Sequence, residues 1–335
     1  MKAVVLHEHG PMDKLVYEEN YPEPECGPSD VIIRVRATSL NYHDLFTRNG
    51  MPGVKLKLPR ICGLDVAGEI VEIGPDVIGW FVGDAVLIDP RNRVEGGLVG
   101  ETIDGGLAEY CLAPDHQLIK IPDGVSYEQA ASLPVAYGTA HRMMVTRGQI
   151  TADDKVLVLG ASGGVGTGAV LLAKMLGAEV VACSSSQTKL LALEKLGADH
   201  VINYLETDFV KEIWNLYTKP HRRKYEGGVT VVVNFTGGDT WVQSMRCLRR
   251  GGRLLTCGAT ESFDPKTDLR YVWSFEFDIL GSNSWEREDL IRMLEYLSEG
   301  AMEVPISGSY PLNQATEALR LIEDREVIGK VIVTP

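Results

Sequence analysis

The residues with the clearest chemical use lie in a turn of small residues near the middle of this 335-residue chain. An apolar segment, Val156–Leu159, runs into Ala161-x-Gly163-x-x-Gly166, a variant of G-x-G-x-x-G. Because such a turn lacks bulky side chains and opens a helix, its free N–H groups and the positive end of the helix dipole suit a pyrophosphate. A structural turn is the alternative, but the strand that follows favours a dinucleotide. The predicted phosphate-contacting residues are Ala161, Ser162, Gly163, Gly164, Val165 and Gly166.

The end of the next predicted strand indicates which dinucleotide is bound. Folds that prefer NAD place Asp or Glu there, about 20 residues on, to bind the ribose hydroxyls. This chain has Ser184, Ser185 and Lys189 in that loop and no acid between residues 181 and 189. Hydroxyls and an ammonium bind a 2′-phosphate that a carboxylate would repel, so the sequence favours NADPH. Capping of the next helix by the serines is the alternative interpretation.

The elements around this turn fall into two regions. Up to about residue 126, short β-branched runs such as Val31–Val35 are separated by Gly, Pro and Asp, which indicates a β-rich barrel or sandwich. From Lys155 to Cys257, strands alternate with amphipathic helices, which indicates a parallel sheet with helices on both faces. The fold class is therefore α/β, with a doubly wound parallel sheet and a β-rich second region.

Composition and charge exclude several classes of protein. Asp and Glu outnumber Lys and Arg by 46 to 33, and the net charge of −13 argues against nucleic acid or an anionic membrane surface as a partner. No apolar run reaches the roughly 20 residues of a membrane helix, and the N-terminus becomes charged too soon for a signal peptide. The six cysteines form no C-x-x-C pair, which indicates reduced thiols in a cytoplasmic protein.

Short motifs along nearly the whole chain together resemble the medium-chain dehydrogenase/reductase superfamily. In order, they are Met1–Val4, Ser39–Asp44, Gly63–Gly68, Val77–Asp84, Gly105–Tyr110, Ala131–Pro134, Gly160–Gly166 and Gly329–Val331. The resemblance implies a Rossmann dinucleotide-binding domain at residues 127–283. It is inserted in a GroES-like catalytic domain formed by residues 1–126 and 284–335, with a small-molecule acceptor in the cleft between the two domains.

Zinc alcohol dehydrogenases of this superfamily carry zinc ligands at three positions that here hold Asn41, Leu64 and Val135. Apolar side chains do not bind Zn²⁺, and Asp65 by itself is a single ligand. The segment Asp89–Glu101, where a four-cysteine structural zinc lobe would lie, contains no Cys. The resemblance therefore predicts that the protein binds no metal.

The zinc-free members that the chain resembles are quinone reductases, enone reductases and enoyl-thioester reductases. Their common chemistry is hydride transfer to a quinone or to the β-carbon of an electron-poor C=C bond, followed by protonation of the enolate. We expect NADPH-dependent reduction of an enone, an enal, an enoyl-thioester or a quinone. Quinone-reducing relatives carry tyrosines at the positions of Phe46 and Pro52, which argues against a natural quinone acceptor. A zinc-independent alcohol or hydroxyacyl dehydrogenase and a non-catalytic, crystallin-like NADPH-binding protein are the alternatives.

The resemblance also assigns roles to individual residues. It places Asn41 near the nicotinamide ribose or the substrate carbonyl, and His43 where alcohol dehydrogenases relay a proton, so that His43 could protonate the enolate. A His43 bonded only to the ribose or to Asp44 is the alternative, and Tyr42 is a second candidate acid. The other predicted cofactor-binding residues are Tyr204, Asn234, Thr236, Gly258, Ala259 and Lys330.

The apolar segment Phe275–Leu280 predicts a strand at the edge of the parallel sheet. In relatives such edges pair across a two-fold axis, so we expect a homodimer. An edge covered by Trp285 and the helix after it is the alternative.

Overall fold

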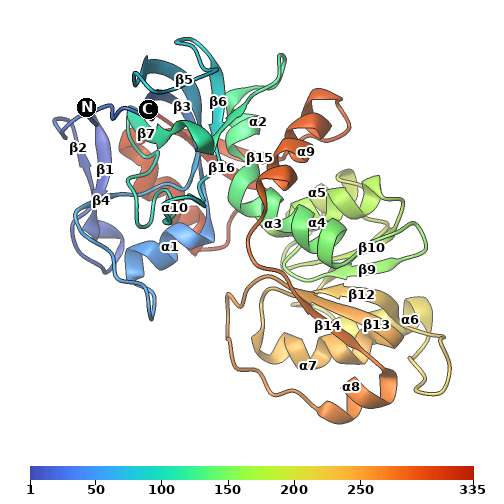
Figure 1. Cartoon of the computed structure of the whole chain (residues 1–335). Coiled ribbons are helices and arrows are strands. Elements are labelled where there is room, and N and C mark those ends of the chain that lie inside the picture. Colours follow the sequence, from blue (N-terminus) through green and yellow to red (C-terminus); the bar gives the residue numbers. More distant parts are fainter. The chain divides into compact units, whose positions relative to one another are not determined.

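The computed structural model describes residues 1–335 and divides them into two compact units. The first unit is Met1–Ala136 together with Arg287–Pro335, and the second is Tyr137–Glu286 (Figure 1). The sequence divides the chain at 126/127 and 283/284, whereas the units divide at 136/137 and 286/287. Residues 127–136 join the first unit because helix α2 (Tyr127–Ala131) packs against the central strands of its sheet.

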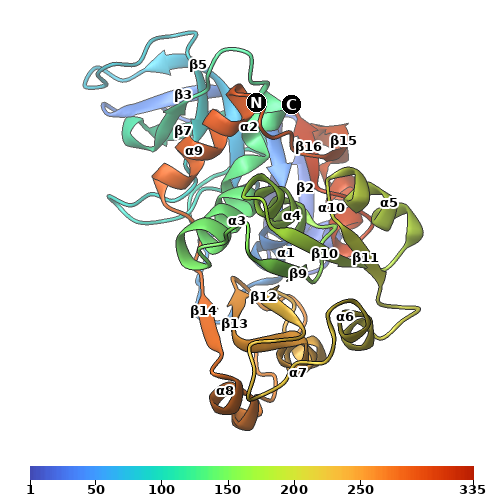
Figure 2. The same ribbon diagram turned by 90° about the vertical axis from the view of Figure 1, so that its right-hand side faces the viewer.

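The first unit contains one large and one small sheet. Its strands are β1 (Ala3–Leu6), β2 (Leu15–Glu18), β3 (Asp30–Leu40), β4 (Arg60–Ile61), β5 (Asp65–Ile73), β6 (Ala85–Ile88), β7 (Tyr110–Pro114), β8 (Leu118–Lys120), β15 (Ile306–Pro311) and β16 (Lys330–Thr334). The large sheet has the order β15-β16-β3-β5-β6-β8, with β7 paired to β3, and the small sheet has the order β2-β1-β4. Because the last strand, β16, pairs with β3, both ends of the chain belong to this unit, and the two termini lie close together in Figures 1 and 2.

Helices close two apolar cores in the first unit. Besides α2, they are η1 (Met12–Lys14), α1 (Tyr42–Asn49), η2 (Asp115–Gln117), α9 (Arg287–Ser298), η5 (Leu312–Gln314) and α10 (Ala315–Glu323). One core joins β1, β16 and α10 and includes Leu6, Leu319 and Val331, all almost fully buried. The other lies inside the large sheet and includes Ile33 and Ile70. Leu40, at the end of β3, and Leu45, within α1, both belong to the first of these cores, and this packing fixes the direction of the first turn of α1.

The second unit is a six-stranded parallel sheet of order β11-β10-β9-β12-β13-β14. The strands are β9 (Lys155–Val158), β10 (Glu179–Ser184), β11 (His200–Asn203), β12 (Val229–Val233), β13 (Leu248–Thr256) and β14 (Asp278–Gly281). All five residues of β12 are buried, as expected for a strand with helices on both faces. The strand order reverses between β9 and β12, and such reversals create a ligand crevice at the carboxyl ends of the strands.

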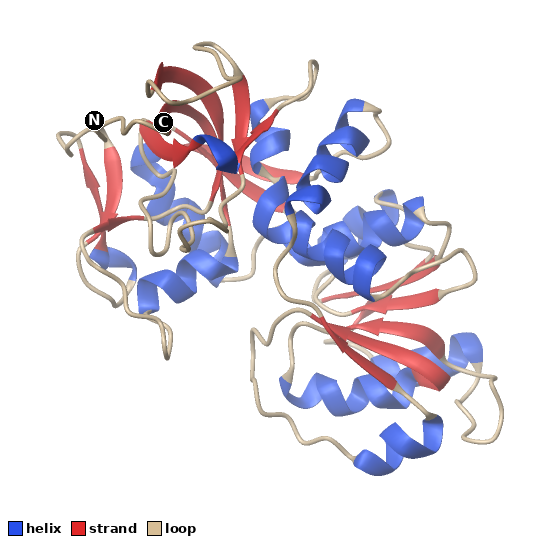
Figure 3. Cartoon of the chain, in the orientation of Figure 1, coloured by secondary structure: helices blue, strands red, loops and turns tan.

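Helices cover both faces of this parallel sheet. They are η3 (Leu133–Gly138, which spans the unit boundary), α3 (Thr139–His141), η4 (Arg142–Arg147), α4 (Gly164–Met175), α5 (Gln187–Lys195), α6 (Phe209–Tyr217), α7 (Gly238–Cys247) and α8 (Leu269–Phe275). α4 and α5 lie on one face, and α6, α7 and α8 lie on the other (Figures 1 and 3). Side-chain caps start three of these helices, at Ser186, Asp208 and Asp268. The predicted fold class, a doubly wound parallel sheet inserted in a β-rich unit, is confirmed.

The edge strand begins later than the sequence predicts. Phe275 ends α8, and Glu276 then adopts a left-handed conformation with a φ of 56° that terminates the helix. The rings of Phe275 and Phe277 stack 5.5 Å apart, and Phe277 is buried, so these aromatic residues join the core of the unit. The prediction of a strand over Phe275–Leu280 is therefore wrong in its first half. The aromatic residues pack into the core, and only β14 forms the edge of the sheet.

None of the helices combines the length and the apolar character needed to cross a bilayer.

Candidate functional site

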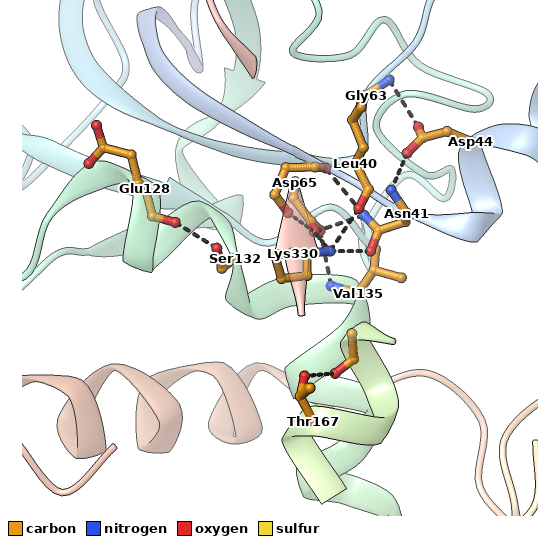
Figure 4. Close-up of polar contacts among 12 residues, drawn as sticks. Leu40, Asn41, Asp44, Gly63, Asp65, Glu128, Ser132, Val135, Thr167 and Lys330 are labelled. Carbon is orange, nitrogen blue, oxygen red and sulfur yellow. Dashed lines mark hydrogen bonds and ion pairs between the residues drawn. The ribbon is translucent and has the colours of Figure 1, made fainter. Parts of the chain in front are cut away.

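A buried ion pair lies where β3, β5 and β16 of the first unit meet the start of α1 (Figure 4). The Lys330 ammonium donates to Asp65 Oδ2 at 3.3 Å, to Asn41 Oδ1 at 2.5 Å and to the Leu40 carbonyl at 3.0 Å. Its side chain is 2% exposed, and that of Asp65 is fully buried. An ammonium has three N–H donors, and all three of Lys330 are bonded to protein acceptors in this structure. The cofactor contact of Lys330 therefore stays a prediction.

The Asp65 carboxylate accepts three further hydrogen bonds. They come from Ser39 Oγ at 2.7 Å, from Asn41 Nδ2 at 2.8 Å and from the Val135 N–H at 3.0 Å. Burial lowers the pKa of Lys330 from its usual value, and the charge of Asp65 opposes that shift. Both polar atoms of the Asn41 amide are therefore bonded inside the protein, so the amide is held rigidly at the N-terminus of α1.

The residues at the three positions where zinc alcohol dehydrogenases carry zinc ligands do not fit a zinc ion. Leu64 is buried and apolar, Val135 directs its backbone N–H at Asp65, and the Asn41 amide is bonded to Asp65 and Lys330. Zinc takes thiolate, imidazole or carboxylate ligands, and only Asp65 supplies one. A protein ammonium already neutralises that carboxylate. No group of three His, Cys, Asp or Glu side chains elsewhere could hold a metal ion.

Asp44 ties the first turn of α1 to the loop before β5. Its carboxylate accepts the Asn41 N–H at 2.8 Å and the Gly63 N–H at 3.2 Å. Burial raises the pKa of Asp44 to about 6, although the bond from the Asn41 N–H acts in the opposite direction. His43 makes no hydrogen bond to Asp44, so the structure does not have the bond that the alternative interpretation of His43 included.

His43 instead contacts a carboxylate from a distant loop. Its Nε2 lies 2.6 Å from Glu101 Oε2, and Glu101 forms no ion pair with a Lys or Arg. The other ring nitrogen, Nδ1, has no hydrogen-bond partner, and the side chain is 28% exposed. The ring can therefore exchange a proton with a ligand through Nδ1. Tyr42, the second candidate acid, packs edge-on against Phe46, with ring centroids 5.2 Å apart.

The small-residue turn of the second unit has the geometry of a phosphate cradle. Gly160 has a φ of 64°, and a Cβ on Gly166 would lie 2.3 Å from the Gly160 carbonyl oxygen, so the helix can pack this closely only without a side chain there. A Cβ on Gly163 would meet only that same oxygen, 3.8 Å away, so this residue faces open space. The first N–H groups of α4, which begins at Gly164, have no acceptor within the helix. Ser162 and Val165 are half-buried in the same turn. These residues fit a dinucleotide pyrophosphate.

The predicted 2′-phosphate residues come together at the ends of β10 and β11. Ser184 pairs with Asn203 across the two strands, and the Tyr204 N–H donates to the Ser184 carbonyl at 3.2 Å. Ser184 is nearly fully buried, whereas Ser185 is half-buried and Tyr204 is exposed. Ser186 caps α5 by accepting the Lys189 N–H, so the capping alternative holds for that serine. The side chains of Ser185 and Tyr204 are at least partly exposed at these strand ends, and Lys189 lies in the first turn of α5 beside them.

A cavity of about 590 Å³ lies at the carboxyl ends of β13 and β14, with Gly258, Ala259 and Cys257 in its lining. Burial raises the pKa of the Cys257 thiol to about 12, so this cysteine stays protonated. Thr236 is half-buried beside the cavity residue Gly237.

Asn234 behaves differently from these neighbours. It is fully buried, its Nδ2 donates to Thr240 and Ser244, and its Oδ1 accepts the N–H groups of Thr236 and Gly237. In this structure the Asn234 side chain holds the turn after β12, and its cofactor contact stays a prediction.

Two features of this geometry escaped sequence reasoning. Lys330 and Asp65 are 265 residues apart, and His43 and Glu101 are 58 apart, so no local spacing joins them. The sequence contains only a weak indication of these contacts. Asp65 and Lys330 both belong to motifs that carried the resemblance, whereas Glu101 belongs to none.

Two family models match separate parts of this chain, and known relatives match it over nearly its whole length. Residues 27–123 match the family described as alcohol dehydrogenase GroES-like domain, and residues 164–299 match the family described as zinc-binding dehydrogenase. An acryloyl-coenzyme A reductase from Sulfurisphaera tokodaii is 33% identical, with 100% of each chain covered. The quinone oxidoreductase of Homo sapiens is 28% identical over 99% of this chain and 97% of its own.

Solved structures agree with these matches. A crystal structure of an NAD-dependent alcohol dehydrogenase has a TM-score of 0.91 and 32% identity, with 100% of each chain covered. The 2-octenoyl-CoA carboxylase reductase CinF, in complex with NADP and 2-octenoyl-CoA, has a TM-score of 0.85 and 28% identity over 99% of this chain and 87% of its own.

Proposed function

Because the chain belongs to the medium-chain dehydrogenase/reductase superfamily, we propose that it is a metal-free, NADPH-dependent reductase of activated C=C bonds or quinones. An α,β-unsaturated thioester is the acceptor that we favour among enones, enals, enoyl-thioesters and quinones. The similarity to an acryloyl-coenzyme A reductase and to a structure with bound 2-octenoyl-CoA supports this choice.

The observation that carries the proposal is the buried Lys330–Asp65 pair, which is bonded to Asn41 and Val135, two of the three residues at the positions of the zinc ligands. Oxidation of a saturated alcohol requires removal of its hydroxyl proton, which a bound zinc ion makes easier. Here Asn41, Leu64 and Val135 supply no zinc ligand, and the ammonium of Lys330 has no free N–H with which to polarise an oxygen. An acceptor that is already electron-poor needs no such help, because its own carbonyl stabilises the charge that hydride transfer creates.

The second unit supplies the proposed NADPH site. When bound, NADPH supplies the hydride. The turn Gly160–Gly166 and the N-terminus of α4 would hold the pyrophosphate, and Ser185, Lys189 and Tyr204 would surround the 2′-phosphate. Absence of a carboxylate between residues 181 and 189 favours NADPH over NADH.

The first unit supplies the proposed proton. Hydride addition at the β-carbon leaves an enolate, and the product forms when the α-carbon takes up a proton. His43 is the titratable side chain of α1 with an unbonded ring nitrogen and an exposed edge, so we assign the protonation to its Nδ1. The rigid network of Asn41, Asp65 and Lys330 positions the start of the helix that carries His43.

Loss of reduced-nicotinamide absorbance across a panel of acceptors tests the function. The panel holds acryloyl-CoA, crotonyl-CoA, a short enone, a quinone, and a saturated alcohol with NADP⁺. We expect the thioesters to be reduced with the largest kcat/KM and the alcohol to be inert, with activity unchanged after dialysis against a chelator. Alcohol oxidation that zinc restores after chelation would overturn the metal-free assignment. Tight NADPH binding without turnover of any acceptor would favour the non-catalytic alternative.

We further propose that the protein is a homodimer paired through β14, the last strand of the parallel sheet. Ile279 in this strand is 41% exposed, and the neighbouring helix α8 exposes Trp273 to 70%. Strand pairing would satisfy the free backbone groups of the edge and bury these side chains. Light scattering of wild type at micromolar concentration is expected to give twice the mass of one chain. Ile279→Lys should reduce that mass to one chain, whereas Leu205→Lys, at an exposed residue outside the edge, should not; a monomeric wild type would contradict the proposal.

A further inference from the structure

A loop of the first unit brings a nearly buried carboxylate to the imidazole of His43. Glu101 Oε2 lies 2.6 Å from His43 Nε2, and the Glu101 side chain is only 10% exposed. An ion pair at the surface would contribute little to stability. A nearly buried carboxylate with a single hydrogen-bond partner instead forms a strong bond that fixes the orientation of that partner. The bond uses Nε2, and the side chain is 28% exposed, so Nδ1 is left as the nitrogen that can meet a ligand.

Backbone packing fixes the place of Glu101. Gly100, which precedes it, has a φ of 76°, and a Cβ there would lie 2.6 Å from the carbonyl carbon of Gly63. Only glycine allows the loop to approach Gly63 this closely. The Glu101 N–H is bonded to the Leu98 carbonyl at 3.1 Å, and the Gly100 N–H to the Ile103 carbonyl at 2.8 Å, so the turn is closed on itself.

The same glycine loop is tied to the helix that carries His43. Asp44 accepts the Gly63 N–H, and it also accepts the N–H of Asn41 at the start of α1. The contacts therefore form a closed ring from α1 through Asp44 and Gly63 to the Glu101 turn, and back to α1 through His43. This ring of contacts holds the Glu101 turn and the helix that carries His43 in a fixed arrangement.

We propose that Glu101 is a positioning residue for proton delivery by His43, an inference that rests on the proposed reductase function. Its carboxylate holds the neutral ring in the tautomer with hydrogen on Nε2, so that Nδ1 takes up a proton and directs it to the acceptor. In the step, hydride from NADPH forms a C–H bond at the β-carbon, and the C=C electron pair moves toward the carbonyl. The Nδ1–H bond then breaks, its proton bonds to the α-carbon, and the products are the saturated thioester, NADP⁺ and neutral His43.

Three variants separate orientation from simple packing. Glu101→Ala removes the acceptor of the Nε2 hydrogen. Glu101→Gln keeps a carbonyl oxygen that can accept it but removes the charge. Glu95→Gln is the matched control, because Glu95 lies in the same loop region and its Oε2 is 3.4 Å from the ring of His116. The measurements are the ¹⁵N chemical shifts of the His43 ring, the kcat and KM for crotonyl-CoA, and the Kd of NADPH.

We expect the wild-type ring to carry its hydrogen on Nε2 and Glu101→Ala to show both tautomers. For Glu101→Ala we expect kcat to fall about 10- to 100-fold, within the range that a positioned proton donor contributes. KM and the Kd of NADPH should stay within about two-fold, because the binding contacts are untouched. Glu101→Gln should keep the single tautomer and retain a kcat between those of wild type and Glu101→Ala, and Glu95→Gln should match wild type.

Two results would overturn the inference. One is a Glu101→Ala variant with the wild-type tautomer and a kcat within two-fold of wild type. The other is a parallel loss of kcat, KM and NADPH affinity, which would mean that Glu101 only supports the local fold. If wild type reduced no acceptor, the proposed function would fail, yet the ring tautomers of wild type and Glu101→Ala would still decide whether Glu101 orients His43.

Discussion

The buried pair of Lys330 and Asp65 should make the first unit sensitive to removal of either charge, and removal of both should cost much less than the two single losses added together. In Lys330→Met, Asp65 keeps three donors, but its charge loses its counter-ion, and the Leu40 carbonyl and Asn41 Oδ1 lose their donor. In Asp65→Asn, the ammonium loses its counter-ion and has only neutral acceptors. Stranding one member of a buried pair costs about 3–5 kcal/mol, so we expect about 4 kcal/mol for each single variant.

The double variant Lys330→Met/Asp65→Asn leaves no unpaired charge. We therefore expect it to lose about 5 kcal/mol of unfolding free energy rather than the 8 kcal/mol or so of independent effects, which gives a coupling of about 3 kcal/mol. Asp65→Asn should also change the pH dependence. Burial already lowers the pKa of Lys330, and loss of the Asp65 charge lowers it further. The unfolded chain then holds a proton that the folded protein lacks, so stability rises with pH, by up to about 1.4 kcal/mol per pH unit below the usual lysine pKa.

Pulsed hydrogen exchange along a urea titration measures these changes unit by unit. Peptides that cover β3 and β16 report on the first unit, and peptides that cover β9 and β12 provide an internal reference that should not move. Single variants whose losses add up in the double variant would refute the coupling. A first unit that is equally stable in Asp65→Asn and wild type would refute the assigned cost of a stranded ammonium.

Three further predictions concern the cofactor turn, the cofactor choice and the pH response. Gly163→Asp should keep its folding cooperativity, because an added Cβ meets open space, but it should lose NADPH binding at least tenfold in a fluorescence titration; unchanged binding would place the phosphates elsewhere. Ser185→Asp should weaken NADPH much more than NADH, whereas an equal effect on both would remove the 2′-phosphate from this loop; the buried Ser184 is unsuitable for this test. Because burial raises the pKa of Asp44 from 3.8 to about 6, its contribution to stability is present at pH 4 and is lost as pH rises through 6. Relative to Asp44→Asn, wild type should lose about 2 kcal/mol between pH 4 and 7, and parallel stability curves would contradict this.

Local patterns in the sequence were enough for the dinucleotide turn of the second unit. The turn around Gly163 lies between β9 and α4, and every element of the motif is within about 20 residues, so backbone preference and hydrophobic period determine it together. Asn234 shows the limit of that approach. Its place after β12 was predicted, but its side chain bonds to Thr240, Ser244 and two backbone N–H groups, because a buried amide satisfies itself with the nearest donors and acceptors.

The first unit required contacts that no local pattern contains. Lys330 reaches Asp65 and Asn41 only because β16, at the end of the chain, pairs with β3, near its beginning. Glu101 reaches His43 only because Gly100 packs on Gly63. A sequence gives the residue types at these positions, but which atoms meet depends on sheet register and on loop closure, and both are long-range.

The charges of the first unit limit the chemistry that the proposed reductase can perform. The Lys330 ammonium is the cation nearest Asn41, but its three N–H groups are bonded to Leu40, Asn41 and Asp65. A zinc ion with an open coordination position stabilises a developing oxyanion, and this fully bonded ammonium cannot do so. The electron-withdrawing power must therefore reside in the acceptor itself, as it does in a conjugated thioester. In the proposed reaction, the first unit holds α1 rigidly and supplies the proton that the enolate takes up. His43, whose Nδ1 has no hydrogen-bond partner, is the group placed to supply it.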